Sequence, residues 1–182
     1  MSDKIIDQIS FKGRLKRLIW NITWVFVFKF TPFFLYEWRN SVLRLWGAKI
    51  GKKVHIYPSV KIWAPWNLEM EDNSCLGHNV NCYSVDKIFI AKNAVISQEV
   101  FLCSASHDIY DVNFKLVAKP IQIKSNVWIA ASAFIGPGVI VGEGAVIGAA
   151  AVVFKNIPPW RVVIGNPARI IKKRKLKKIS MN

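Results

Sequence analysis

The sequence predicts an all-β fold, a parallel β-helix of about five coils, and three observations favour it. An aliphatic residue returns at every sixth position from Ile123 to Val153, and another apolar residue follows each of them by four positions. The position directly after the leading aliphatic residue is small in four of six cases, which are Ala130, Gly136, Gly142 and Gly148. Helices and simple strands have other periods, whereas stacked hexapeptide repeats produce this pattern.

Each hexapeptide is expected to form a short strand and a tight corner, with the leading aliphatic side chain stacked inward on its equivalent in the next coil. Small residues suit the corners, because a bulky side chain there would collide with the neighbouring coil. Asn126, Gly138 and Gly144 tolerate a left-handed backbone, which costs most other residues about 1–2 kcal/mol. Evenly spaced ordinary buried strands are the alternative, but six consecutive repeats in register favour the coil.

Residues 1–49 are expected to form a basic and hydrophobic helical segment ahead of the coil. The run from Leu18 to Trp38 is apolar and aromatic, and its length approaches the roughly 20 residues that a membrane-spanning helix needs. Lys29 near its centre and Pro32 disfavour a span. We expect the segment to lie on an anionic membrane surface, with its aromatic side chains at the headgroup level. The alternative is a helical cap that packs on the open end of the coil.

The coil domain is expected to span residues 50–171. A short amphipathic helix over residues 38–46, ended by Gly47, is predicted to lead into the first hexapeptide at Ile50. The register slips by two residues around Asp72 and then resumes. The sequence therefore predicts a coil that is regular at its C-terminal end and less regular nearer its start.

One segment breaks the repeat completely. Between Leu102 and Ile123 the period fails, since Asp108 and Pro120 fall where an aliphatic residue is required. Residues 104–120 are therefore predicted to form a loop that leaves the coil. Loops carried by a rigid scaffold are where function tends to lie.

The formal net charge of +15 is concentrated at the two ends of the chain. Residues 1–49 carry a net charge of +6 and residues 50–158 only +1, whereas residues 159–182 hold eight basic residues and no acidic one. Such ends favour anionic partners, including phospholipid, nucleotide phosphate and nucleic acid. The basic tail over residues 172–182 is expected either to contact phosphate or membrane, or to be a solvated extension.

The cysteines indicate a reduced compartment. Cys75, Cys82 and Cys103 show no metal-type spacing, and their odd number argues against a disulfide framework. We interpret them as small buried apolar residues. The polar residues that precede the apolar run do not have the layout of a signal peptide.

The chain has three histidines, and one of them is a candidate catalytic residue. His55 and His78 lie at outward-facing positions of hexapeptides, where a surface histidine needs no special explanation. His107 opens the predicted loop, at the junction of a rigid coil and a flap. A neutral imidazole there suits a general base, because its unperturbed pKa of about 6.5 lies near working pH.

Four segments resemble a known family, and they are Phe101–Asp108, Asn126–Ala130, Gly47–Gly51 and the closing run Ile157–Arg169. Together with the hexapeptides they resemble the left-handed β-helix acyltransferases, and most closely the colanic-acid-type exopolysaccharide O-acetyltransferases. The resemblance implies a left-handed coil, an exception to the usual right-handed crossover. It also implies a homotrimer with acetyl-CoA bound in the cleft between neighbouring coils.

The resemblance further implies roles for individual residues. His107 would take the proton of an acceptor hydroxyl that attacks the thioester, and the backbone N–H of Ala131 would stabilise the oxyanion. Asn81 would contact the acceptor, and Asp108 would either orient His107 or simply begin the loop. The residues that match positions along acetyl-CoA are Trp128, Ala149, Lys155, Arg169 and Lys172. Trp128 could instead be a core or corner residue.

Two positions depart from the pattern of the family. Phe154 stands where a small polar residue is common, which puts one coenzyme contact in doubt, and Ala130 replaces a glycine. The implied acceptor is a sugar or a lipid-linked oligosaccharide of a cell-envelope glycan, with no metal requirement. The implied location is the cytoplasm, peripheral to the inner face of the cytoplasmic membrane.

Three other functions fit the sequence less well. A metal-dependent hydratase of the γ-carbonic-anhydrase kind needs three imidazoles on one zinc, but only His107 lies in a suitable loop. A non-catalytic membrane scaffold would use the coil as a rigid rod and would give His107 no role. Nucleic-acid binding is disfavoured, because the basic residues are terminal and no recognition motif accompanies them.

Overall fold

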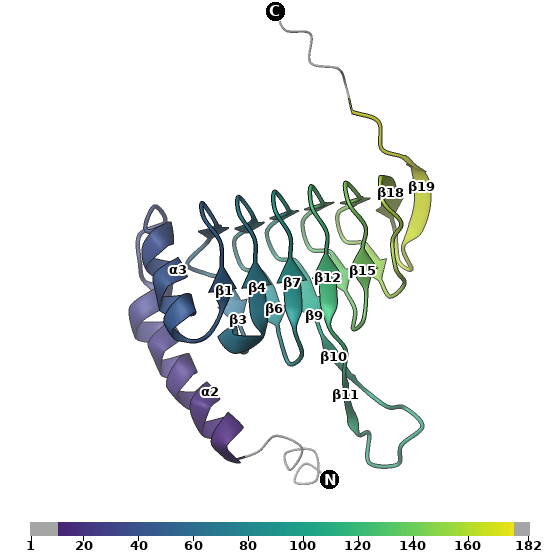
Figure 1. The fold of residues 1–182 in the computed structure, drawn as a ribbon. Helices are drawn as coiled ribbons and strands as arrows, with labels where there is room; N and C mark the ends of the chain where they lie inside the picture. The colour runs from purple at the N-terminus through teal and green to yellow at the C-terminus, as the bar shows by residue number, and fades with distance from the viewer. Residues whose placement is uncertain (1–10, 177–182) are drawn as a thin grey trace, which may run out of the picture.

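The computed structural model describes residues 11–176, so the start of the N-terminal segment and the end of the basic tail lie outside the described residues. Helices α2 (Phe11–Thr23) and α3 (Tyr36–Leu45) lie at one end of an elongated coil, and strands β18 (Arg161–Ile164) and β19 (Arg169–Lys173) lie at the other (Figure 1). A hairpin of β10 (Ala105–His107) and β11 (Leu116–Ala118) projects from the side of the coil.

Three parallel sheets form the faces of the coil. Face 1 holds β1 (Lys49–Ile50), β4 (Leu68–Met70), β7 (Ile88–Ile90), β12 (Ile121–Ile123) and β15 (Ile140–Val141). Face 2 holds β2 (His55–Ile56), β5 (Cys75–Leu76), β8 (Val95–Ile96), β13 (Trp128–Ile129), β16 (Val146–Ile147) and β18. Face 3 holds β3 (Lys61–Ile62), β6 (Asn81–Tyr83), β9 (Phe101–Cys103), β14 (Phe134–Ile135) and β17 (Val152–Val153). The chain visits the faces in turn, so five coils are complete and β18 belongs to a sixth.

The slip in the repeat has a structural cause at the corner between face 3 and face 1, called here corner 3/1. Ile50 pairs with Met70 and Met70 with Ile90, so the first coils are twenty residues long. Ile123 pairs with Val141, only eighteen residues later. The two extra residues of the first coil lie before Met70, where the 3₁₀ helix η2 (Pro65–Asn67) turns the chain into β4. The hairpin of β10 and β11, which carries His107, leaves the coil at the same corner, two coils later.

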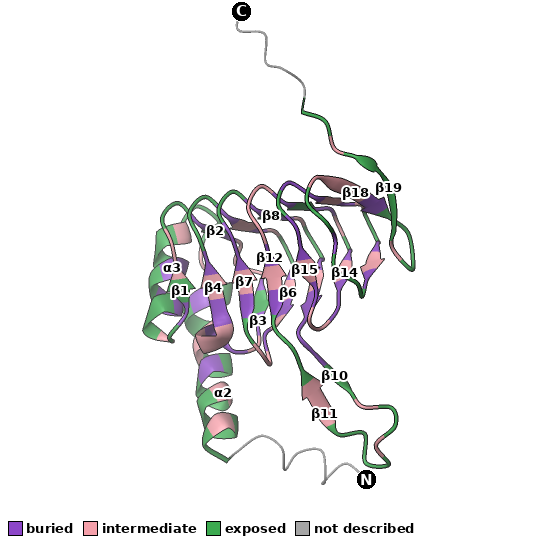
Figure 2. Ribbon diagram, turned by 45° about the vertical axis from the view of Figure 1, so that its right-hand side comes forward, coloured by how far each residue is buried: buried purple, intermediate pink, exposed green. Residues whose placement is uncertain are grey.

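The interior of the coil is the predicted one. All six leading aliphatic residues from Ile123 to Val153 are buried, and so are the six apolar residues that follow them by four positions. Figure 2 shows that buried residues alternate with residues of intermediate or greater exposure along the strands. Cys82 is fully buried in this core, and burial raises the pKa of its thiol to about 12. Its thiol is therefore neutral and inert at ordinary pH.

The corners also follow the prediction. Asn126, Gly138 and Gly144 have φ angles of 60°, 77° and 65°, which confirms the left-handed backbone expected at these positions. Gly142 is required for a different reason. A Cβ atom there would lie 2.5 Å from the backbone nitrogen of Pro159, so the next coil could not pack as closely.

The N-terminal segment is helical, as the sequence predicts. Helix α2 continues into the π-helix η1 (Trp24–Lys29), and a turn then leads to α3. Helix α3 ends at Leu45, close to the predicted end, and Gly47 follows with a φ angle of 88°. The N–H of Gly47 donates to the carbonyl of Arg44 at 2.9 Å, which closes the helix in the expected left-handed turn.

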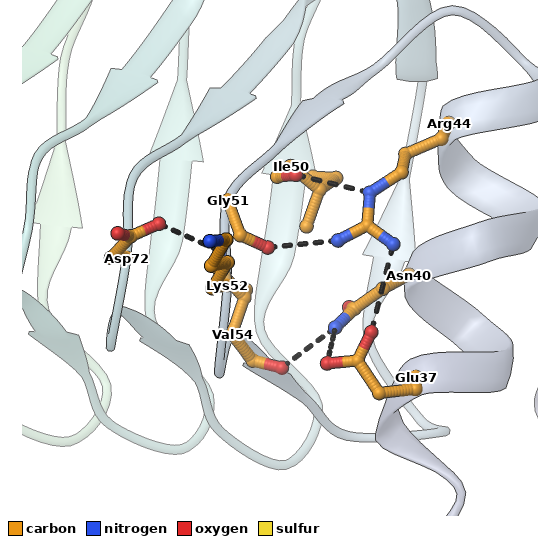
Figure 3. A network of polar contacts seen from close by, with 8 residues as sticks. All are labelled: Glu37, Asn40, Arg44, Ile50, Gly51, Lys52, Val54 and Asp72. Carbon is orange, nitrogen blue, oxygen red and sulfur yellow. Dashed lines mark hydrogen bonds and ion pairs between the residues drawn. The ribbon is translucent and has the colours of Figure 1, made fainter.

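The helices close the open edge of the first coil. Residues of the first coil donate N–H groups to carbonyls of the second coil, as Gly51 does to Met70 at 2.8 Å. The carbonyls that lie at the open edge of the first coil need donors from outside the coil, because an unpaired buried carbonyl is costly. Arg44 donates to the carbonyls of Ile50 and Gly51 at 3.0 and 2.8 Å, and Asn40 donates to that of Val54 at 2.9 Å (Figure 3).

Three further donors complete this edge. Arg39 Nε donates to the carbonyl of Ile56 at 2.7 Å. The indole Trp24 Nε1 donates to the carbonyl of Val60 at 2.8 Å, and Trp20 Nε1 to that of Ile62 at 2.7 Å. Arg39 is fully buried and also donates to Thr31, Pro32 and Phe33, so its guanidinium joins the coil, the turn and α3. The helical cap considered from the sequence is therefore present.

The outer side of this cap is strongly apolar. Side chains of large hydrophobic residues are exposed along α2, η1 and the turn before α3, and they are Phe11, Leu15, Leu18, Ile19, Ile22, Phe26, Val27, Phe30, Phe33, Phe34 and Leu35. Trp38, at the start of α3, is 51% exposed. Within residues 11–176, no helix combines the length and apolar character needed to cross a membrane.

Candidate active site

His107 lies at the end of β10, opposite Leu116 of β11, and its side chain is exposed. Its Nδ1 atom lies 2.6 Å from the carbonyl oxygen of Phe114. A carbonyl oxygen only accepts, so Nδ1 carries the proton in the neutral ring and Nε2 has the free lone pair. Phe114 has a φ angle of 49°, and this left-handed backbone is part of the turn that brings its carbonyl back to the histidine. The geometry leaves Nε2 available as a proton acceptor.

Asp108 takes part in the turn of the hairpin. Its Oδ1 atom accepts from the backbone N–H of Tyr110 at 2.9 Å, and its own N–H donates to the carbonyl of Lys115 at 2.9 Å. Of the two roles that the sequence left open, these contacts favour the structural one. The group on Nδ1 of His107 is the Phe114 carbonyl, which sequence reasoning did not find.

Trp128, Ala131 and Ala149 lie together around the corner between face 2 and face 3, called here corner 2/3. The indole of Trp128 is 48% exposed and donates to Ser97 Oγ at 3.0 Å. The N–H of Ala150 donates to the carbonyl of Ala131 at 2.9 Å, which places Ala131 and Ala149 on adjacent coils. Within residues 11–176, the N–H groups of Ala131 and Ala149 donate no hydrogen bond. Two small residues thus present free donors at this corner.

The basic candidates lie near the C-terminal end of the coil. Lys155 follows β17 at corner 3/1, and it lines a shallow depression of about 80 Å³ together with Phe154 and Arg169. Lys172 is exposed in β19. None of these three cations forms an ion pair with another of the described residues. The structure therefore brings Lys155 and Arg169 together, with the exposed ring of Phe154 beside them.

One chain does not bring all of these candidates together. His107 and Lys155 lie at corner 3/1, whereas Trp128, Ala131 and Ala149 lie at corner 2/3, across the width of face 3. Asn81 lies on face 3 itself, in β6, where it lines a groove against α2. The two groups could meet only if corner 3/1 of one chain faced corner 2/3 of another.

The other two histidines, His55 on face 2 and His78 at corner 2/3, have local partners. The ring of His55 stacks on Tyr36 with centroids 4.4 Å apart, and His78 lies 3.3 Å from Ser59 Oγ. In the part of the chain that the structure describes, no group of three or more His, Cys, Asp or Glu side chains is arranged to hold a metal ion.

The fold has counterparts among known proteins. Residues 120–155 match the family model "Bacterial transferase hexapeptide (six repeats)". A galactoside acetyltransferase in complex with coenzyme A superposes with a TM-score of 0.83 over 96% of this chain and 91% of that chain, at 27% identity. A maltose O-acetyltransferase from Clostridium difficile 630 gives a TM-score of 0.79 over 89% and 88%, at 30% identity. The chain belongs to the hexapeptide-repeat acetyltransferases, which fold as left-handed β-helices.

Within that family, one relative is similar over nearly the whole length. The protein named as the colanic acid biosynthesis acetyltransferase WcaF of Escherichia coli K12 is 44% identical over 167 residues, which are 91% of this chain and 92% of that protein. The galactoside O-acetyltransferase of the same organism is 31% identical over 139 residues, 75% of this chain and 68% of that protein. The similarity to WcaF includes most of the N-terminal segment as well as the coil.

Proposed function

We propose that this protein transfers an acetyl group from acetyl-CoA to a sugar hydroxyl in the synthesis of exopolysaccharide or another cell-envelope glycan. The observation that carries this proposal is the exposed imidazole of His107, whose Nδ1 is held by the Phe114 carbonyl so that Nε2 faces outward as a base. The relatives named as sugar or exopolysaccharide acetyltransferases support this reaction class.

The residues present fit an acyl-CoA. Positive charge for the nucleotide phosphates comes from Lys155, Arg169 and Lys172, which form no ion pair with another described residue. The exposed indole of Trp128 and the small Ala149 leave an open apolar surface at corner 2/3 for the pantetheine arm. Acetyl-CoA would supply the acetyl group as a thioester.

His107 would drive the transfer as a general base. Nε2 takes the proton of the acceptor hydroxyl while its oxygen forms a bond to the thioester carbonyl carbon. The free N–H of Ala131 would bind the oxygen that becomes negative, because a preorganised donor stabilises the tetrahedral state most. When the C–S bond breaks, the histidinium returns the proton to the leaving sulfur. The proton thus passes from the acceptor hydroxyl through His107 to the sulfur of coenzyme A, and the reaction needs no other proton donor or acceptor.

We further propose a homotrimer in which each active site is shared by two chains. Corner 3/1 of one chain would supply His107 and Lys155, and corner 2/3 of its neighbour would supply Trp128, Ala131 and Ala149. Cyclic symmetry makes the three sites identical, since each chain uses both corners once. The projecting hairpin is the element that would reach the neighbouring chain (Figure 1).

A transfer assay tests the proposed reaction. Purified protein is incubated with acetyl-CoA that is radiolabelled in the acetyl group, together with envelope glycan precursors extracted from a bacterial membrane. We expect label in a carbohydrate product that mild alkali releases as acetate, since alkali cleaves an O-acetyl ester. Label that appears only as free acetate, whatever the acceptor, would contradict the proposal.

We also propose that the outer side of the helical cap lies on an anionic membrane. The exposed apolar residues of α2, η1 and the following turn would enter the interface, as amphipathic surface helices do. Lys12, Arg14 and Lys29 are exposed on the same elements and would lie among anionic headgroups. Exposed apolar patches of this extent on a protein surface generally mark an interaction site.

Vesicle flotation tests this contact. Replacing both Phe26 and Phe30, which are 78% and 75% exposed, with aspartate should release most of the protein from vesicles that contain phosphatidylglycerol. Neither side chain contributes to the buried core, so the melting temperature should hardly change. Replacing the exposed Phe154 at the far end of the coil with aspartate is the matched control. Equal flotation of the Phe26/Phe30 variant and the wild type would contradict membrane contact through this surface.

A further inference from the structure

A groove of about 500 Å³ lies between helix α2 and face 3, and nothing in the reaction proposed above uses its helical wall. The helix side is formed by Trp20, Asn21, Trp24 and Val25. The coil side is formed by Lys61, Ile62, Trp63, Asn81, Tyr83 and Phe101. Aromatic residues therefore make up half of the lining, and the side chains of Asn21, Lys61 and Asn81 lie among them. A site with large apolar walls and a few polar groups is typical of ligand-binding pockets.

The polar side chains of the groove have no partners. Within residues 11–176, the side chains of Asn21, Lys61 and Asn81 make no hydrogen bond or ion pair. Lys61 and Asn81 lie side by side, since they are paired in the register of β3 and β6. One cation and two amides are thus presented to the same space without an internal role. An anionic group that also accepts hydrogen bonds would satisfy all three.

Arg17 adds a second positive charge at the edge of the groove. Its guanidinium carbon lies 3.3 Å from the ring centroid of Trp63, one of the lining residues. Burial lowers the pKa of Arg17, and the described residues offer it neither a carboxylate nor a hydrogen-bond acceptor. A stacked guanidinium keeps its N–H donors free for an in-plane acceptor, and phosphate fits that fork well. Arg17 and Lys61 together therefore favour a phosphate group.

Helix geometry connects this groove to the apolar surface of the cap. Arg17, Asn21 and Val25 are four residues apart and form the stripe of the helix that faces the groove. Leu18, Ile22 and Phe26 follow each of them by one residue and form the adjacent stripe, and all three are more than half exposed. The polar groove and the exposed apolar stripe therefore run side by side along the same helix. A ligand in the groove could extend an apolar part over this stripe.

We infer that the groove binds the acceptor substrate, and that the acceptor is a sugar joined through phosphate to a hydrocarbon chain. The sugar would lie against Trp63, Tyr83 and Asn81 on face 3, on the side of the coil from which the His107 hairpin also projects (Figures 1 and 2). The phosphate would lie between Arg17 and Lys61, and the hydrocarbon chain would pass over Ile22 and Phe26. This inference rests on the proposed acetyl transfer and names its substrate class.

The alternative source of a sugar phosphate is a nucleotide sugar, whose base could stack on the same aromatic rings. The exposed stripe favours the lipid-linked form, since a nucleotide has no apolar chain to cover it. Three probes with the same hexose separate these chemistries. Farnesyl diphosphate-linked glucose has both the phosphate and the chain, UDP-glucose has only the phosphate, and octyl glucoside has only the chain.

Binding is measured by calorimetry on the full-length protein without acetyl-CoA, at probe concentrations below micelle formation. We expect the farnesyl-linked sugar to bind at least about tenfold more tightly than either of the other probes. Replacing Arg17 or Lys61 with alanine should each weaken its binding about tenfold or more, as loss of a charge-assisted hydrogen bond does. Lys52 is the matched control: it is an exposed lysine at another corner of the same coil, its side chain has no partner among the described residues, and its alanine variant should bind normally.

Lys61 is exposed, so its substitution leaves the fold intact even if that of Arg17 disturbs α2. Tighter binding of UDP-glucose would overturn the lipid-linked assignment, and equal binding of octyl glucoside would overturn the role of phosphate. Unchanged binding by the Lys61 variant would overturn the site itself. Failure of the proposed acetyl transfer would appear separately, as a protein that binds the farnesyl-linked sugar but transfers no label to it.

Discussion

Replacing His107 with alanine should lower the rate of acetyl transfer by at least about a hundredfold, because a positioned general base typically contributes that much. His107 is exposed, and the hydrogen bond between its Nδ1 and the Phe114 carbonyl favours the tautomer in which Nε2 can accept a proton. The exposed side chain makes one hydrogen bond, to Phe114, so the fold should survive its loss. The rate is measured with saturating acetyl-CoA and the acceptor identified by the labelling assay.

The matched measurements separate catalysis from assembly. His107→Ala should keep the affinity for acetyl-CoA and the oligomeric state of the wild type, since among the described residues the imidazole forms a hydrogen bond only to Phe114 of the same hairpin. Asp108→Asn serves as the control within the same hairpin and should retain most of the activity, because its side chain still accepts from the N–H of Tyr110. An alanine variant at His107 with activity within about tenfold of wild type would rule out the general base.

The second large effect concerns stability. Arg39→Leu should lower the free energy of unfolding by at least about 3 kcal/mol, because four acceptors in the cap and first coil lose a buried charged donor. For a chain of this size that corresponds to a fall of about 6–12 °C in melting temperature. Thermal unfolding followed by circular dichroism measures the change.

Arg44 provides the comparison for Arg39. It also donates to two carbonyls of the first coil, but its side chain is partly exposed and water can replace it. Arg44→Leu should therefore cost only about 1 kcal/mol. If the two variants melt at the same temperature, the buried guanidinium of Arg39 does not hold the edge of the coil.

The coil could be predicted in detail because its chemistry repeats. The positions of Ile129 and Ala133 in the repeat have the same surroundings in every coil, so one local rule predicts the burial of all equivalent residues. The left-handed corner at Asn126 follows from side-chain sterics in the same way. The hairpin could be located because it interrupts this rule, although the sequence predicted a loop and did not indicate that β10 and β11 would pair.

Contacts between distant segments could not be predicted. The edge carbonyls exist only once the coil has formed, so no pattern in the sequence indicates that Arg39 and Trp20 donate to the carbonyls of Ile56 and Ile62. The Phe114 carbonyl on His107 depends on one backbone angle in a turn, which no side-chain pattern encodes. The four-residue spacing of Arg17 and Asn21 does predict that the two polar side chains share one side of a helix. It does not predict the groove, because the other wall of the groove is face 3 of the coil.

The central claim is that each active site is shared between two chains, and subunit complementation tests it most directly. Ala149→Trp would block corner 2/3, and its exposed position should accept the larger side chain. His107→Ala would disable corner 3/1, so each variant alone should be inactive. After unfolding and refolding together in equal amounts, about a quarter of the sites should combine two intact corners, and about a quarter of wild-type activity should return.

A mixture of His107→Ala with the double variant His107→Ala/Ala149→Trp is the control and should stay inactive, because no chain in it supplies the base. Size-exclusion chromatography confirms that the refolded mixtures contain the same assembly as the wild type. Recovery of about a quarter of the activity is the result that a shared site predicts. No recovery in a correctly assembled mixture of the two single variants would show that one chain forms the whole site, which would contradict this account.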